Sequence, residues 1–122
     1  MSNPSFKVVV LISGNGSNLQ SLIDRKIIDE ETPYEIATVI SNQVDAYGLE
    51  RAKVANIPTL VIDHTIHNTR EDFDAELIKE IDLLSPSLIV LAGFMRILTT
   101  SFVNHFQERL INIHPSLLPL YP

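Results

Sequence analysis

The sequence contains no cysteine among its 122 residues, and it contains no long apolar run. The first absence excludes disulfide bonds, thiolate nucleophiles and cysteine-based zinc sites, and it is typical of a cytoplasmic protein. No stretch approaches the ~20 apolar residues that a membrane span needs. The first residues, Met1–Ser5, lack the basic region of a secretory signal. We therefore expect a cytoplasmic chain that does not engage a membrane.

Basic residues are also few, with 9 Lys and Arg against 15 Asp and Glu, and the net charge is −6. They form no basic cluster, so we expect no nucleic-acid partner. An anionic ligand would have to be bound by local backbone N–H groups against this overall charge. His64 and His67 have a spacing seen in metal sites, but a metal needs more ligands. We expect no metal, and a solvated loop over Asp63–Asn68.

What the sequence does contain is a regular alternation of strand-like and helical segments. Its 45% hydrophobic and 20% charged residues are typical of a globular protein, and the length suits one domain. The strand-like runs are Phe6–Ile12, Ile36–Ile40, Thr59–Ile62, Leu88–Ala92 and Leu110–Ile113. Such alternation predicts an α/β fold: an open, Rossmann-like parallel sheet with helices on both faces. The first and fourth runs are the most apolar, so we expect them at the centre, in strand order 3-2-1-4-5.

Capping residues place the helices between these runs. Ser17 is expected to cap the first helix and Asp45 a second helix that runs to about Ala55. Thr69 begins a capping-box pattern before a helical stripe that holds to Pro86, and Thr99 can cap a short helix.

The predicted strand order places three motifs at one edge of the sheet. Ligands of open α/β sheets bind outside the carboxyl ends of the strands, where the strand order reverses. The loops at that point are Ser13–Asn18 and Gly93–Arg96, and the fifth strand brings Asn112 and His114 to the same edge. We therefore expect all three to converge on one crevice.

Each motif has a chemical interpretation and a simpler alternative. Asn112 and His114 lie two apart on a strand and face one way, so they could stabilise a carbonyl oxygen that becomes an anion. Alternatively, neighbouring backbone satisfies both groups. The turn Ser13–Asn18 is neither a P-loop nor Gly-x-Gly-x-x-Gly, but its glycines and following helix suit one phosphate. It could equally be a tight connection. Gly93–Arg96 could lie against a flat aromatic ligand, or it could only plug the end of the sheet.

In combination, these motifs resemble the folate-dependent formyltransferases, within them the glycinamide ribonucleotide branch. The matching stretches are Val8–Gln20, Ser41–Ala52, Leu91–Leu98 and Ile111–Pro119. The element Asn112-Ile113-His114-Pro115-Ser116-Leu117-Leu118-Pro119 is similar to one shared by the wider family, and the Gly-Asn-Gly-Ser-Asn turn selects the branch.

The resemblance implies a reaction in purine biosynthesis. The amine of glycinamide ribonucleotide attacks the formyl carbon of the co-substrate 10-formyltetrahydrofolate, through a tetrahedral oxyanion. In that reaction Asn112 donates to the oxyanion, and His114 stabilises the same charge or helps to move a proton. The resemblance assigns the substrate phosphate to Asn15, Gly16, Ser17 and Asn18. It assigns the folate side to Arg70, Phe94, Met95, Arg96 and Leu98.

Two features depart from the family pattern. The sequence ends at Leu120-Tyr121-Pro122, where the family continues, and the family's third catalytic residue, an aspartate, lies in the part beyond. We therefore expect residues 1–122 to be a single N-terminal fragment, the phosphate-binding half, inactive or nearly so alone. Leu120 also stands where relatives often have a basic residue.

Other functions remain open at this point. The chain could belong to another folate-dependent formyltransferase or a deformylase, or it could be a non-catalytic phosphate-binding module. An incomplete parallel sheet exposes an edge strand, which would also allow a homodimer.

Overall fold

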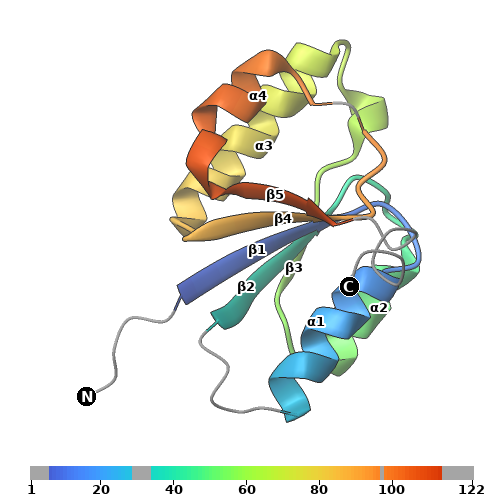
Figure 1. The fold of residues 1–122 in the computed structure, drawn as a ribbon. Coiled ribbons are helices and arrows are strands. Elements are labelled where there is room, and N and C mark those ends of the chain that lie inside the picture. The colour runs from blue at the N-terminus through green and yellow to red at the C-terminus, as the bar shows by residue number, and fades with distance from the viewer. Residues whose placement is uncertain (1–5, 29–33, 97, 114–122) are drawn as a thin grey trace.

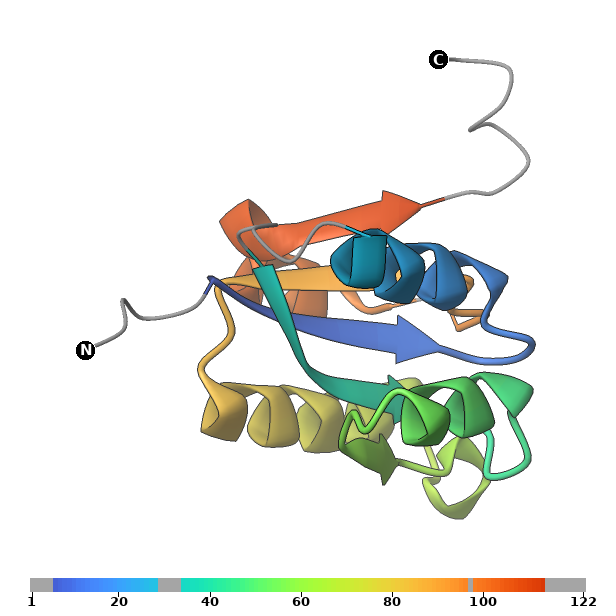
Figure 2. The same cartoon turned by 90° about the horizontal axis from the view of Figure 1, so that it is seen from below.

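The computed structural model describes residues 6–28, 34–96 and 98–113, with the side chains of residues 26–28 left undescribed. Its sheet contains five strands in the order β3-β2-β1-β4-β5, as the sequence predicts (Figure 1). They are β1 (Phe6–Ile12), β2 (Tyr34–Ser41), β3 (Thr59–Val61), β4 (Leu88–Ala92) and β5 (Leu110–Ile113). Every neighbouring pair is parallel, so all arrows point the same way in Figure 2.

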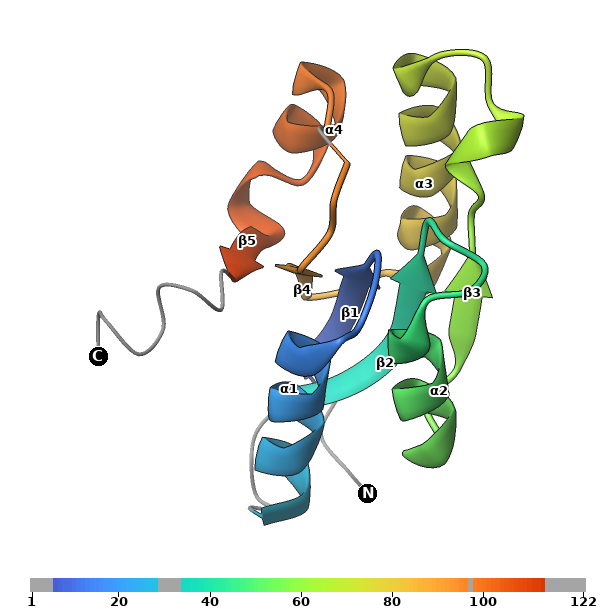
Figure 3. The ribbon, with the colours of Figure 1, turned by 90° about the vertical axis from the view of Figure 1, so that its right-hand side faces the viewer.

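The helices cover both faces of the sheet, which confirms the predicted layers. They are α1 (Ser17–Ile28), α2 (Tyr47–Val54), α3 (Arg70–Leu84) and α4 (Thr100–His105), with 3₁₀ turns at His64–Ile66 and Gln107–Arg109. Figure 3 shows α1 and α2 on one face and α3 and α4 on the other.

The apolar run of β1 is continuous because the strand lies at the centre and is buried on both sides. Val8, Val10 and Ile12 pack in the cluster with α1 and α2. Val9 and Leu11 face the opposite way and pack in the cluster with α3 and α4. Alternate side chains of a strand point to opposite faces, so only a central strand needs apolar residues at every position.

Three local predictions differ from the structure. Ser17 is the first residue of α1, not its cap, and Ala46 precedes α2 without a side-chain cap, so the capping role predicted for Asp45 was wrong. The start of α2 is instead satisfied by backbone, because the N–H of Gly48 donates to the carbonyl of Gly14 at 2.9 Å. The segment expected as a solvated loop, Asp63–Asn68, contains a 3₁₀ turn, with Asp63 as its N-cap.

The cap of α3 confirms its prediction and gives a stability test. The Thr69 hydroxyl accepts a hydrogen bond from the N–H of Asp72 at 3.0 Å. We expect Thr69→Ala to lower the free energy of unfolding by about 1 kcal/mol, since that N–H loses its partner. Urea denaturation measures the change, with Thr69→Ser, which keeps the hydroxyl, as the matched control. Equal stability of the two variants would contradict the capping role.

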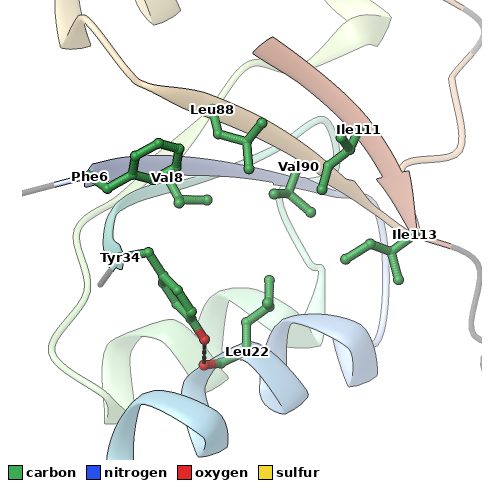
Figure 4. A pocket seen from close by; sticks show the side chains of 8 residues that line it. All are labelled: Phe6, Val8, Leu22, Tyr34, Leu88, Val90, Ile111 and Ile113. Carbon is green, nitrogen blue, oxygen red and sulfur yellow. Dashed lines mark hydrogen bonds between the residues drawn. The ribbon is translucent and has the colours of Figure 1, made fainter. Parts of the chain in front are cut away.

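One part of the sheet is not packed tightly against its helix. On the side of α1, side chains of β1, β4 and β5 face a groove of about 280 Å³ between the sheet and α1 (Figure 4). Its lining residues are Phe6, Val8, Leu22, Tyr34, Leu88, Val90, Ile111 and Ile113. The hydroxyl of Tyr34 donates to the carbonyl of Leu22 at 2.7 Å, and burial raises the pKa of this phenol. The groove is apolar, and Ile113 at the end of β5 belongs both to its lining and to the predicted catalytic edge.

Candidate functional site

Hydrogen bonds join the three predicted motifs at the carboxyl edge of the sheet. The backbone N–H of Met95 donates to the hydroxyl of Ser13 at 2.7 Å, which links the loop after β4 to the turn after β1. The side-chain amide of Asn18 donates to the carbonyl of Ile113 at 3.3 Å, which links the same turn to the end of β5. These two bonds confirm that both loops and the end of β5 meet at this edge, as the strand order predicts, while the position of His114 lies outside the described residues.

The turn after β1 is shaped by a contact between two glycines. Gly16 has a φ of +82°, and a Cβ placed on it would lie 2.6 Å from the Cα of Gly48. A Cβ on Gly48 would lie 3.2 Å from the Cα of Gly16. Only glycine allows two backbones to approach so closely. The first turn of α2 therefore holds the turn after β1, the predicted phosphate site, in place.

Arg51, on the same helix, forms hydrogen bonds to this turn. Its Nε donates to the carbonyl of Asn15 at 2.7 Å, and one terminal nitrogen donates to Oδ1 of Asn15, also at 2.7 Å. The other terminal nitrogen reaches Oε1 of Gln20 at 3.1 Å. Our sequence analysis did not identify Arg51. The sequence feature that could have identified it is its spacing from Gly48, because residues three apart lie on the same face of a helix.

The charge of Arg51 is available to a ligand. Its hydrogen-bond partners are neutral amides and its guanidinium carbon lies 5.0 Å from the centroid of the Tyr47 ring, and no carboxylate of the described residues lies within ion-pair distance of it. It therefore sets a local positive charge against the net charge of −6. The first N–H groups of α1 also point out of the helix without intrahelical partners. Together these groups suit an anion such as a phosphate monoester.

The residues assigned to the phosphate differ in what they already contact. Ser17 is exposed and Gly16 is buried in the glycine contact. The side chain of Asn18 is 7% exposed and bound to β5, and Asn15 is bound to Arg51. The buried Asn18 is therefore left mainly with its backbone N–H for a ligand, whereas the exposed Asn15 also keeps its side-chain NH₂ group.

Asn112 lies on β5 opposite Leu91 of β4, and its side chain is exposed. No hydrogen bond joins that side chain to any other residue in the part of the chain that the structure describes. Ile111 and Ile113 line the apolar groove on the α1 side. By alternation Asn112 faces the other side, where Phe94 packs. His114 lies outside the described residues, so its predicted pairing with Asn112 stays a prediction.

The loop after β4 is built around an aromatic stack. Phe94 stacks on Phe73 of α3, with ring centroids 6.5 Å apart and an angle of 16° between the planes. The guanidinium carbon of Arg96 lies 5.3 Å from the centroid of the Phe73 ring. Met95, by contrast, is 79% exposed. The loop therefore covers the end of the sheet with Phe94 and leaves Met95 exposed, and contact of this loop with a flat ligand stays a prediction.

A buried carboxylate fixes the far end of this loop. Oδ2 of Asp74 accepts from the backbone N–H of Thr99 at 2.6 Å, and Asp74 is 2% exposed. Leu98 packs against the apolar cluster beside α3 and α4. Arg70 is exposed in the first turn of α3. The sequence analysis gave no role to Asp74, which only its tertiary contact reveals.

The two histidines near this edge, His64 and His67, each contact a polar group of a neighbouring residue. Nδ1 of His64 contacts the amide of Asn42, and Nδ1 of His67 contacts the carbonyl of Asp63. The hydroxyl and N–H of Thr65 lower the pKa of the Asp63 carboxyl by hydrogen bonding. Within residues 6–28, 34–96 and 98–113, no three His, Asp or Glu side chains could share a metal ion, and no helix could cross a membrane.

Comparison with known proteins shows what the chain is similar to. The model of the family described as "Formyl transferase" matches residues 6–122. The phosphoribosylglycinamide formyltransferase of Escherichia coli (strain K12) is 53% identical over 115 residues, which cover 94% of this chain and 54% of that protein. The human trifunctional purine biosynthetic protein adenosine-3 is 44% identical over 115 residues, covering 94% of this chain and 11% of that protein.

A solved structure has the same fold. The phosphoribosylglycinamide formyltransferase of Coxiella burnetii aligns with a TM-score of 0.86 and 54% identity, over 97% of this chain and 55% of that one. The chain thus spans about half the length of these bacterial relatives. Because the family model matches nearly the whole sequence, the chain belongs to the formyl transferase family.

Proposed function

We propose that the protein to which this chain belongs transfers the formyl group of 10-formyltetrahydrofolate to the amine of glycinamide ribonucleotide. The observation that carries this proposal is the hydrogen bond between Asn18 and Ile113, because it sets a turn suited to phosphate beside the strand that holds Asn112. A substrate whose phosphate lies on the turn would extend toward Asn112. Relatives in Escherichia coli and Coxiella burnetii are named for the same reaction.

The roles follow from the chemistry of each group. Backbone N–H groups of Asn15, Gly16, Ser17 and Asn18 bind the phosphate, and the charge of Arg51 assists them. The amide of Asn112 donates to the oxyanion formed when the amine adds to the formyl carbon. His114 stabilises that charge or carries a proton.

The folate side is assigned to the loop after β4 and to α3. Met95 is exposed for contact with a flat pteridine, while Phe94, Arg96 and Leu98 shape the loop behind it. Arg70 lies at the start of α3, where its cation can meet the carboxylates of a folate tail.

We further propose that residues 1–122 are one N-terminal domain part, the phosphate-binding half, and that they work in the cytoplasm. The bacterial relatives are about twice as long, so the rest of the active site would come from the remaining portion. The 122-residue chain assayed alone should then show little turnover, and turnover equal to that of the E. coli relative would contradict this.

Arg51→Met tests the phosphate site directly. We expect the dissociation constant for glycinamide ribonucleotide to rise about tenfold, or ~1.4 kcal/mol, because the turn loses its clamp and its local cation. Isothermal titration calorimetry measures the affinity. Lys53→Met is the matched control, since Lys53 is on the same helix with an exposed ion pair to Glu50.

The outcomes separate the candidates. Equal weakening by both variants would show only the loss of net charge and would contradict a built phosphate site. Specific weakening by Arg51→Met, together with formyl transfer by the protein at its full natural length, supports the transferase. Specific weakening without any formyl transfer would favour a non-catalytic phosphate-binding module.

A further inference from the structure

Ser13 has two hydrogen-bond partners, and each comes from a different loop. It follows β1 and is buried, with 7% of its surface exposed. Its hydroxyl donates to Oδ1 of Asn42 at 2.6 Å and accepts from the N–H of Met95 at 2.7 Å. A serine hydroxyl has a single proton, so these two bonds fix its orientation.

The contacts continue across the edge of the sheet. Asn42 is 2% exposed and follows β2. Its Nδ2 lies 3.2 Å from Nδ1 of His64, and that same Nδ1 lies 3.1 Å from the backbone carbonyl of Asn42. One of these two contacts is a hydrogen bond at a time, depending on which ring nitrogen carries the proton. Polar contacts thus run from the loop after β4, through Ser13 and Asn42, to the turn after β3.

The hydroxyl of Ser13 acts on the loops more than on the sheet. Pairing between β1 and β4 already extends to Leu11 and Leu91, and backbone hydrogen bonds hold that part. Beyond it, the chain leaves the sheet at Gly93, which has a φ of +76°. The hydrogen bond from Met95 to Ser13 therefore joins the loop after β4 to the turn after β1, through residues 82 positions apart.

We infer that Ser13 is a positioning residue that sets the separation between the turn of residues 14–18 and the loop of residues 93–96. This rests on the proposed function, in which the turn holds the phosphate of one substrate and the loop borders the other. The amine and the formyl carbon must meet within about 3.5 Å, and misplacement by about 1 Å can lower the rate ~100-fold. The hydroxyl of Ser13 thereby fixes one loop relative to the other without touching either substrate.

Steady-state kinetics on the protein at its full natural length test this inference. We expect Ser13→Ala to lower kcat ~10- to 100-fold, while the KM of each substrate changes less than about threefold, because each loop keeps its own contacts. Ser13→Thr, which retains the hydroxyl, should recover most of the loss. Ser21→Ala is the control, since its hydroxyl donates, among the residues described, to the carbonyl of Ser17 within α1.

A second measurement is independent of the reaction. In a titration with inorganic phosphate, the backbone amide resonance of Met95 should shift in the wild type and stay unmoved in Ser13→Ala, with thermal unfolding showing that the variant is folded. An equal response in both proteins, or no response in the wild type, overturns the inference. A wild type without formyl transfer but with the expected Met95 response would overturn the proposed function and leave the coupling by Ser13 standing. If the wild type is active and Ser13→Ala has the same kcat, the inference about Ser13 is overturned and the proposed function stands.

Discussion

Replacement of Gly16 by alanine is expected to raise the dissociation constant for glycinamide ribonucleotide at least 100-fold. Two costs combine at this position. The φ of +82° is unfavourable for any residue with a Cβ, and that atom would lie 2.6 Å from the Cα of Gly48. Backbone, unlike a flexible side chain, cannot move aside without shifting α2, and overpacking of this kind costs about 1–3 kcal/mol. The turn would therefore lose the geometry that aims its N–H groups at one phosphate.

Gly14→Ala provides the matched control for this experiment. Gly14 belongs to the same turn, but a Cβ on it would meet no atom within 4 Å, and its φ is not positive. We expect the affinity of Gly14→Ala for glycinamide ribonucleotide to stay within about twofold of the wild type. Calorimetry measures both affinities, and thermal unfolding separates loss of the turn from loss of the fold. Binding by Gly16→Ala that matches Gly14→Ala would show that the glycine contact is not needed for the site.

Replacement of Asn112 by alanine is expected to lower kcat ~100- to 1,000-fold in the protein at its full natural length. The reason is that one donor to a developing oxyanion contributes about that factor. The exposed side chain has no hydrogen bond to any other described residue, so its removal leaves no buried group unpaired. The KM of glycinamide ribonucleotide should change little, because a bond made only in the transition state does not hold the ground state.

Two further variants sharpen this test. Asn112→Asp keeps the shape but replaces a donor by an anion facing the oxyanion, so it should be at least as damaging as alanine. Asn104→Ala removes an exposed amide from α4 and should leave kcat unchanged. A rise in KM with unchanged kcat for Asn112→Ala would assign Asn112 to substrate binding alone.

The architecture followed from the sequence because β1 and β4 are buried on both faces. Their continuous apolar runs identify central strands, and the order 3-2-1-4-5 follows once they are neighbours. The bounds of β1, β4 and β5 agree with the expected runs residue by residue, while β2 begins earlier, at Tyr34, and runs on to Ser41. The apolar runs predicted the strands well where burial decides the residue type.

The parts of the site that the sequence analysis missed depend on contacts between distant residues. A glycine inside a helix is ordinarily destabilising, whereas the role of Gly48 is to let Gly16 approach. Asp45 looked like a cap, but the carbonyl of Gly14 takes the N–H of Gly48 instead. Arg51 likewise has its partner 36 positions away, at Asn15. Propensity and spacing describe a residue's own neighbourhood, so such partners appear only in the folded chain.

The central position of β1 also shapes how the domain folds. β1 emerges first but completes its pairing only when β4 arrives, and the contact between Lys7 and Ser87 spans 80 positions. Closing a loop of that length costs roughly 4 kcal/mol of chain entropy before the strand pairing repays it. Folding should therefore be slow compared with that of helical domains of similar size, with the β1–β4 encounter as its committing step.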